Sequence, residues 1–383
     1  MYKALDEMLG NNLTLIFSAK RTPNDVKRLI AQALGNRAIP LEGERISRLG
    51  ANDQEFANVG FRIPFQPGLL RAVLDAKPEV IIAEGFFQWT PAALWLRIRE
   101  GVRLVIAYER TMHTERHAGK ARTLYRKLVT KFTDAMCCNG SLAKEYCTNV
   151  LGFPTERIVT GAMAADTDAI SRASARIRGE NLVTIEKALN LIRPVFLYVG
   201  RLIRLKGLRE LLLAWKQYKV MSGVGSLLLV GDGPERVELE SIIRDQGIVN
   251  VTFAGRIEQK DIVPYYALGD VLVMPTLEDN WSLVVPEAMA CSKPILCSRY
   301  NGCWPELVRE EVNGYVFDPL DAGTLATLFQ ACSDNPTRLA EMGNASYEIV
   351  KAFTPQKAAE AAMKACLIAA GHSNSSLPYP KLQ

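Results

Sequence analysis

The sequence predicts an α/β protein with two doubly wound domains in tandem, each built on a parallel sheet. Three observations support this class. Short apolar runs alternate with helical patterns along almost all of the 383 residues, as in consecutive βαβ units. The alternation pauses in a polar stretch at 169–192 and then restarts. The length suits two domains of ordinary size better than one.

The first part of the chain, 1–168, is expected to form an N-terminal domain. Its beginning is unusual, because residues 2–9 already have the pattern of a helix. The strand at 13–18 would then be the second strand of a doubly wound sheet, so either the first strand is missing or the domain is built differently. We expect strands within 12–19, 79–85, 102–109 and 134–140, and helices within 67–78, 90–101 and 142–152.

The polar stretch 169–192 is expected to be a linker with room for one helix, and 193–352 a C-terminal domain. Residues 353–383 are expected to form a C-terminal helix, which packs back on the N-terminal domain, and a loose polar tail. Strands are expected within 194–200, 226–233, 250–255, 270–276 and 294–299, and the last helices within 337–353 and 355–370.

The composition is that of a globular protein, with 48% hydrophobic residues and a formal net charge of +5. No apolar signal region opens the chain, and no run approaches the roughly 18 apolar residues of a membrane span. The eight cysteines do not form a disulfide framework or a zinc pattern: Cys291, Cys297 and Cys303 recur at every sixth residue without a histidine nearby. We therefore expect buried thiols in a cytoplasmic protein, and no metal site.

A basic segment around 119–134 has a helical pattern. Leu124, Leu128 and Phe132 recur at steps of four and are expected to be buried in the N-terminal domain. The outward cations would either form a solvated helix face or contact phosphates or the anionic inner face of a membrane. The residues expected to point outward are Lys120, Arg122, Arg126, Lys127 and Lys131.

Three loops in the second half follow a strand and precede a helix, which is where open α/β sheets bind ligands. In VGRLIRLKGL, Gly200 ends a strand, and Arg201 and Lys206 flank the turn into the next helix. Two cations beside a helix N-terminus suit a diphosphate, although ordinary surface residues would look the same. In VGDGPE, Gly231 allows either a close backbone approach to a ligand or simply a tight turn.

The third loop, EDNWSLVVPEAMAC at 278–291, places Asp279 and Glu287 on either side of a loop-to-helix transition. The helix is expected to begin near 284–286, because proline is well tolerated in a first turn. Glu287 would then either complement the helix dipole or accept hydrogen bonds from a ribose diol. The backbone amides of Ser282 and Leu283 would point toward an anion.

Across roughly 194–321 the chain resembles the retaining glycosyltransferases of family four, also called glycosyl transferases group 1. These enzymes have the GT-B fold of two tandem Rossmann-like domains. The matching pieces include VGRLIRLKGL, LLLVGDGPE, NVTFAGRI, DVLVMPTLEDNWSLVVPEAMAC and KPILCSRYNG, in family order. The family's acid–seven–acid signature falls on Asp279 and Glu287, with aspartate where the family usually has glutamate. Glu278 is the alternative first acid, and Ser282 replaces a usual glycine.

The resemblance implies a role for each of these residues. Glu287 would hold the ribose, Asp279 would lie near the hydroxyls of the donor sugar, and Arg201 and Lys206 would neutralise the diphosphate. His113, after an N-domain strand, is the preferred match to a family histidine near the donor sugar, although a surface histidine is an equal interpretation. The implied donor-binding set is Gly200, Arg201, Lys206, Gly231, Arg256, Ser282, Leu283 and Glu287.

The function implied by the resemblance is hexosyl transfer from a nucleotide diphosphate sugar to a hydroxyl acceptor, in polysaccharide or glycolipid biosynthesis. It requires no metal or other cofactor, because cations and amides would hold the diphosphate. The expected partners are the donor and a saccharide or lipid-linked acceptor, and no nucleic acid. Two alternatives remain: a sugar-nucleotide epimerase or hydrolase of the same fold, and a nucleotide-sugar-binding protein without transfer activity.

Overall fold

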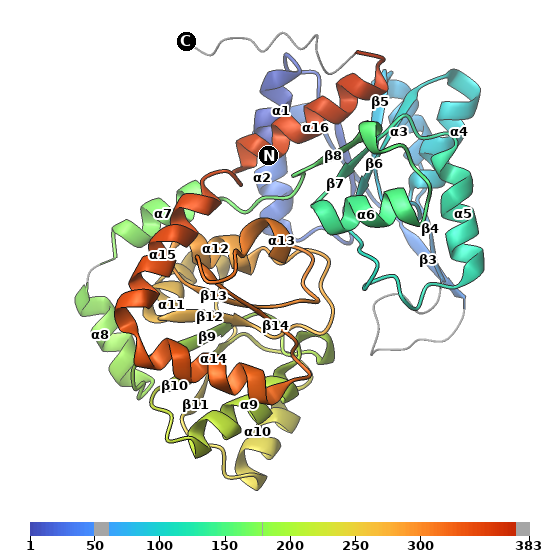
Figure 1. Ribbon diagram of the computed structural model, residues 1–383. Helices are drawn as coiled ribbons and strands as arrows, with labels where there is room; N and C mark the ends of the chain where they lie inside the picture. The colour runs from blue at the N-terminus through green and yellow to red at the C-terminus, as the bar shows by residue number, and fades with distance from the viewer. Residues whose placement is uncertain (50–60, 178, 373–383) are drawn as a thin grey trace. The chain divides into compact units, whose positions relative to one another are not determined.

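The computed structural model describes residues 1–49, 61–177 and 179–372 of the chain. It divides into two compact units (Figure 1). The first unit comprises Met1–Met163 together with the segment that begins at Pro355, and the second comprises Ala164–Thr354. Each unit is described here by itself.

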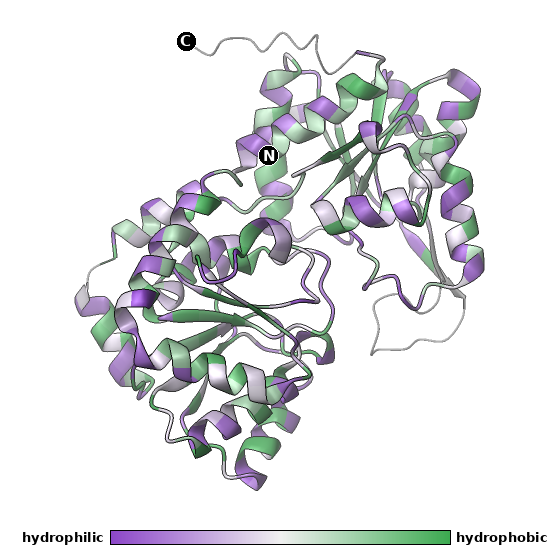
Figure 2. Cartoon of the chain, viewed as in Figure 1, coloured by the Kyte–Doolittle hydropathy of each residue, from purple (hydrophilic) through white to green (hydrophobic). Residues whose placement is uncertain are grey.

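The second unit is built on a six-stranded, fully parallel sheet. Four of its strands are buried at every residue, which explains their continuous apolar sequences (Figure 2). The order is β11-β10-β9-β12-β13-β14, so the direction of strand addition reverses between β9 and β12. The strands are β9 (Val195–Val199), β10 (Ser226–Val230), β11 (Val251–Gly255), β12 (Val271–Met274), β13 (Ile295–Ser298) and β14 (Gly314–Phe317).

Helices pack on this sheet through a buried aromatic cluster. The ring of Phe196 in β9 lies 4.7 Å from that of Phe329 and 5.6 Å from that of Trp215, centroid to centroid, in edge-to-face arrangements. This cluster joins the sheet to α9 and α14. The helices of the second unit that surround the expected site are α9 (Leu208–Val220), α10 (Arg236–Asp245), α11 (Val263–Leu268), α12 (Val284–Ala290), α13 (Trp304–Leu307), α14 (Ala322–Asp334) and α15 (Pro336–Val350).

The stretch 169–192, expected to be a linker with room for one helix, carries most of two helices. They are α7 (Thr167–Ala175) and α8 (Gly179–Ala188). Asp166 caps α7 by accepting a hydrogen bond from the amide of Ala169 at 3.1 Å, and Ile170 is buried. α7 packs against α11 and α12, so this segment is part of the second unit.

The described residues of the first unit form three sheets. The largest is parallel, in the order β5-β6-β7-β8. The expectation that the strand at 13–18 belongs to one doubly wound sheet differs from the structure, because β1 pairs with β2 in a separate two-stranded sheet. The third sheet is an antiparallel pair, β3 with β4. The strands are β1 (Leu15–Ser18), β2 (Ala38–Leu41), β3 (Arg45–Leu49), β4 (Phe61–Phe65), β5 (Val80–Glu84), β6 (Arg103–Tyr108), β7 (Ala135–Cys138) and β8 (Ile158–Thr160).

One face of the β5–β8 sheet is covered by α16 (Pro355–Ala369), which returns from the far end of the sequence. Its small residues allow close packing: Ala361 and Ala365 lie in one cluster with Val105 and Cys137 of the sheet. On another side α16 contacts α1. The other helices of this unit are α1 (Tyr2–Met8), α2 (Asn24–Leu34), α3 (Leu69–Ala76), α4 (Thr90–Glu100), α5 (Lys120–Thr130) and α6 (Ser141–Asn149).

The orientation expected for α5 is wrong. Leu124 is 70% exposed and Leu128 52% exposed, whereas Arg122 and Arg126 are buried. The reason is a buried carboxylate in the preceding loop. Both terminal nitrogens of Arg126 donate to Glu115, at 2.5 and 2.9 Å, so the guanidinium turns inward and the leucines turn outward.

The cysteines are free, and seven of the eight are buried, with Cys366 partly exposed. Burial raises the pKa of Cys137 and Cys332 to about 12, so these thiols stay protonated near neutral pH. They act as small packing residues, as expected from the sequence. Among the described residues, none of the helices reaches the length and hydropathy that a membrane crossing needs.

Candidate functional site

The candidate site of the second unit lies where β9 and β12 end side by side. At this point the strand order reverses, which is where open α/β sheets bind ligands. The backbone oxygen of Leu205 holds the two loops together. It accepts hydrogen bonds from the hydroxyl of Thr276 at 2.9 Å, the amide of Leu277 at 2.8 Å and the amide of Glu278 at 3.2 Å. The loop that carries Asp279 is therefore fixed against the loop that carries Arg201 and Lys206.

Glycines make this close approach possible. Gly207 has φ +67°, and a Cβ there would lie 2.0 Å from the carbonyl oxygen of Pro275 in the neighbouring loop. Gly231, at the end of β10, has φ +140°, and a Cβ there would lie 1.8 Å from the carbonyl oxygen of Gly200. The glycines of VGRLIRLKGL and VGDGPE are thus required by the packing of the strand ends, whether or not a ligand is bound.

Lys206 and Asp279, predicted to contact different parts of a ligand, form an ion pair with each other. Both side chains are mostly buried, with exposed fractions of 20% and 14%. The backbone of Asp279 is anchored on the loop after β13, because its amide donates to Tyr300 at 3.3 Å and its carbonyl accepts from Gly302 at 3.0 Å. The carboxylate is therefore fixed in place, while the lysine reaches it on a flexible stem.

Arg201 is exposed beside this pair. Its backbone oxygen accepts a hydrogen bond from the hydroxyl of Tyr198 at 2.9 Å. The pKa of Tyr198 is raised, first by burial and then by the charge of Asp279, while the charge of Arg201 lowers it. The charges of Arg201 and Asp279 thus both affect the pKa of the buried Tyr198 hydroxyl. Arg204, the other cation of the loop, instead pairs with Glu210 at 2.6 Å.

Glu287 lies in the first turn of α12 and is 9% exposed. Its two oxygens accept hydrogen bonds from the hydroxyl of Tyr266 at 2.5 Å and from the side-chain amide of Gln259 at 3.1 Å. Burial raises the pKa of Glu287, and the two hydrogen bonds lower it in part. The sequence analysis missed Tyr266 and Gln259, because nothing in the local pattern of the segment after β11 links it to the acid after β12.

The remaining predicted residues differ in accessibility. Glu278 is 5% exposed and Ser282 is also 5% exposed, whereas Leu283, just before α12, is 38% exposed. Arg256 is exposed at the end of β11. The side chain of Asp279 is more accessible than Glu278, which favours Asp279 as the ligand-facing acid of the pair.

Asn301 is a site residue that the sequence analysis did not find. It is fully buried and is bridged to Asp279 through the backbone. Its side-chain oxygen accepts from the amide of Cys303 at 3.3 Å, and its Nδ2 atom has no hydrogen-bond partner among the described residues. The only sequence signal was its place in KPILCSRYNG, a piece that we used for the resemblance alone.

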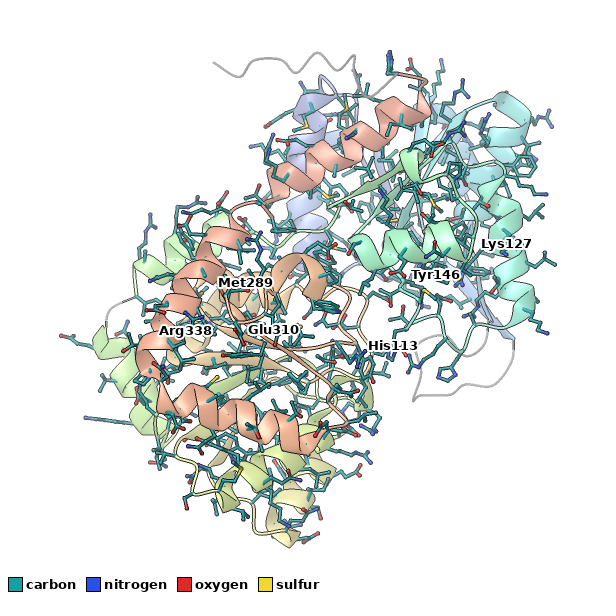
Figure 3. All side chains as sticks on the ribbon, viewed as in Figure 1. His113, Lys127, Tyr146, Met289, Glu310 and Arg338 are labelled. Atoms are coloured by element: carbon teal, nitrogen blue, oxygen red, sulfur yellow. The ribbon has the colours of Figure 1, made fainter. Side chains whose placement is uncertain are left out.

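His113 belongs to the first unit, in the loop after β6 (Figure 3). It is half-buried, and its carbonyl oxygen accepts from the guanidinium of Arg116 at 2.6 Å. The same loop carries Glu115, which binds Arg126, and Arg126 also donates to the hydroxyl of Tyr146 at 2.9 Å. This buried network fixes the shape of the loop, but the role of His113 in the reaction stays a prediction.

Within the described ranges, His, Cys, Asp and Glu side chains do not gather in groups of three that could hold a metal ion. The cations and backbone amides of this site suit an anionic ligand. Lys206 and Arg201 come from the loop after β9, and Asp279 and Glu287 come from the segment after β12.

The fold and this site define a protein of the GT-B class, with two α/β units and a doubly wound second unit. Residues 185–349, which lie in the second unit, match the family described as "Glycosyl transferases group 1". The chain is similar in fold to Anabaena HepE in complex with UDP, with a TM-score of 0.73 and 16% identity over 95% of this chain and 94% of that one.

Curated relatives match part of the chain. The alpha-D-kanosaminyltransferase of Streptomyces kanamyceticus is 28% identical over 145 residues, which are 38% of this chain and 37% of that enzyme. The lipopolysaccharide core biosynthesis glycosyltransferase LpsE of Rhizobium meliloti is 35% identical over 156 residues, which are 39% of this chain and 44% of that enzyme. The chain thus matches less than half the length of these two relatives.

Proposed function

We propose that this protein is a glycosyltransferase that moves a sugar from a nucleoside diphosphate sugar to a hydroxyl acceptor with retention of anomeric configuration. The observation that carries the proposal is that the loop of Arg201 and Lys206 meets the loop of Asp279 at the switch point of a doubly wound sheet, where Lys206 pairs with Asp279. The match of residues 185–349 to glycosyl transferases group 1 supports it.

In this proposal the chain acts mainly by positioning and by electrostatics. Glu287 accepts hydrogen bonds from the ribose hydroxyls, in a pocket where burial keeps the contact out of water. Lys206 and Arg201 bind the diphosphate and stabilise the charge that develops on it as the glycosidic bond breaks. Asp279 then contacts hydroxyls of the donor sugar. The leaving diphosphate takes the acceptor proton on the same face, which accounts for retention.

The names of two curated relatives support a proposal for the acceptor class. One curated relative is a phosphatidylinositol monomannoside mannosyltransferase of Mycolicibacterium smegmatis, and another acts in lipopolysaccharide core biosynthesis. For this chain we propose hexosyl transfer in polysaccharide or glycolipid biosynthesis. The neighbour bound to UDP makes UDP sugars the first donors to test.

The experiment is a screen of nucleotide sugars with an acceptor panel, read by mass spectrometry. A glycosylated acceptor from the native chain, lost in Lys206→Ala and Asp279→Asn, is the expected result. Turnover of the donor without any acceptor would favour an epimerase or hydrolase. Tight donor binding without turnover over a broad panel would favour a binding protein, and either outcome would overturn the transferase proposal.

Binding measurements test the two cations separately from turnover. Lys206→Ala and Arg201→Ala should each weaken nucleoside diphosphate affinity by roughly 1–3 kcal/mol, as for a lost charge-assisted hydrogen bond. Lys216→Ala is the matched control, because this exposed lysine lies on α9 and contacts Gln246. Unchanged affinity in both test variants, measured by calorimetry, would remove these residues from the diphosphate site.

A further inference from the structure

α5 presents an apolar stripe to solvent. Leu124, Leu128 and Phe132 are 70%, 52% and 37% exposed, and steps of four residues place them along one side of the helix and its C-terminal turn. The inward side of α5 is already occupied. Val129 is fully buried, and Arg126 binds Glu115. The leucines therefore cannot turn inward without breaking a buried ion pair, so their exposure is fixed by the fold.

The stripe is flanked by cations. Lys120, Lys127 and Lys131 are exposed on the same helix and its C-cap, and Figure 3 shows Lys127 on the outer side of α5. The helix, KARTLYRKLVT, contains no acidic residue. An exposed helix with leucines on one stripe and lysines beside them is typical of helices that lie in the plane of a membrane interface.

α4 extends this surface. Trp95 and Ile98 are 41% and 60% exposed, and the guanidinium of Arg99 lies over the Trp95 ring at 5.3 Å. Ala93 of α4 and Val129 of α5 lie in one buried cluster with Leu104 of β6, so both helices cover the same face of the β5–β8 sheet, as right-handed crossovers require, and α16 covers the other face. Arg97 on α4 donates a hydrogen bond of 2.9 Å to Asp134, which lies between α5 and β7.

We infer that the outer face of α4 and α5 docks on a lipid bilayer that carries anionic headgroups. Leu124, Leu128 and Ile98 enter the boundary between headgroups and acyl chains, and the Trp95 ring lies at the headgroup level, where indoles are enriched. Lys127 and Lys131 contact the anionic headgroups. This surface lies in the first unit and goes beyond the proposed function, because it concerns where the protein acts.

Charge decides between a bilayer and a second copy of the chain. A second copy placed on the same patch would bring lysines against lysines, because a two-fold interface joins identical surfaces. An anionic surface instead attracts every exposed cation of α5. Each lysine near such a surface increases affinity about fivefold, and the attraction is screened within about 10 Å at 0.1 M salt.

The experiment is cosedimentation of the full chain with vesicles of phosphatidylcholine alone or mixed with phosphatidylglycerol, at low and high salt. We expect binding to the mixed vesicles at low salt, and weaker binding at high salt. Leu124→Gln with Leu128→Gln should lower binding about tenfold or more, because each leucine buries apolar area in the interface. Leu29→Gln on α2 is the matched control, with an exposed fraction of 64%.

Charge reversal tests the second half of the inference. Lys127→Glu with Lys131→Glu should lower binding to mixed vesicles at least about 25-fold, from two lysines at about fivefold each. The control is Lys3→Glu with Lys20→Glu, which changes the net charge by the same amount at two other exposed positions. This control variant should retain most of its binding to mixed vesicles. Circular dichroism and thermal melts confirm that the variants are folded.

Three results would overturn the inference. One is no binding to mixed vesicles at low salt, and another is equal binding to neutral and anionic vesicles. The third is a native dimer that the double leucine variant converts to monomers, since the stripe would then serve a second copy. The assay needs no donor or acceptor, so its failure would leave the proposed transferase activity untouched.

Discussion

The Lys206–Asp279 ion pair predicts that one substitution has opposite effects on two ligands. In the structure the ammonium that should bind a diphosphate is held by the carboxylate that should bind the sugar. Asp279→Asn removes the negative charge and releases the lysine. We therefore expect this variant to bind a nucleoside diphosphate more tightly than the native chain, and yet to transfer sugar more slowly.

The magnitude follows from the burial of the pair. Fully exposed pairs contribute about 0.2–1 kcal/mol. Two charges 4 Å apart at an effective dielectric of 20 attract by about 4 kcal/mol before desolvation is subtracted. The side chains of Lys206 and Asp279 are 20% and 14% exposed, so the interaction energy of this pair lies between these two values. A net gain of about 1 kcal/mol in the free energy of diphosphate binding corresponds to roughly fivefold tighter binding of the diphosphate to Asp279→Asn.

The assay is calorimetric titration of UDP and GDP, and of the corresponding nucleotide sugars, into native chain and variant. The free diphosphate should gain affinity, and the nucleotide sugar should gain less because it loses the Asp279 contact. Glu210→Gln is the matched control, since it breaks the neighbouring ion pair to Arg204 without touching the site. Unchanged or weaker diphosphate affinity in Asp279→Asn would refute the reasoning.

Three further predictions concern buried features. Tyr266→Phe removes a hydrogen bond that lowers the pKa of Glu287, so the pKa of this acid should rise further. As the pH is lowered, Glu287 should then protonate earlier, and nucleotide affinity should begin to fall at a higher pH than in the native chain. Calorimetry at a series of pH values would measure this. Gly231→Ala should destabilise the second unit by more than about 1 kcal/mol, because its Cβ would overlap a backbone carbonyl; an unchanged melting temperature would contradict this. Arg126→Met leaves Glu115 buried without its main partner, so the free energy of unfolding measured with denaturant should fall by about 3 kcal/mol. Lys127→Met, on the exposed side of α5, should leave the free energy of unfolding almost unchanged.

Strands with continuous apolar sequences could be predicted from the chain alone. β9 (VFLYV) and β10 (SLLLV) are buried on both faces, so every position except Ser226 is apolar and the pattern is clear. The short strands were missed. β8 has only three residues, and β2 contains a proline and is half exposed, so neither leaves a pattern that distinguishes it from a loop.

The orientation of α5 shows a limit of hydrophobic periodicity. The leucines gave the clearest apolar stripe, and periodicity alone turns such a stripe inward. The structure turns it outward because one carboxylate, Glu115, holds Arg126 inside by two hydrogen bonds. That partner precedes the helix in sequence, and only the folded loop brings it beneath the helix.

Within the candidate site, the sequence identified side chains better than their contacts. Motif order was enough to select Lys206, Asp279 and Glu287, because each lies at the end of a strand in a recognisable loop. It could not predict that Lys206 binds Asp279, or that Tyr266 supports Glu287. Such contacts join segments from different strand ends, and their spacing along the chain carries no information about them.

The return of α16 to the first unit has a consequence for synthesis on the ribosome. The β5–β8 sheet needs α16 to cover one face, yet all of Ala164–Thr354 is translated before this helix. At about 5–20 residues per second the delay is roughly 10–40 s. During that interval Val105 and Cys137 have no cover from Ala361 and Ala365, and the nascent sheet presents an apolar face to chaperones. The second unit, contiguous in sequence, can finish folding first, so the order of completion is the reverse of the order of synthesis.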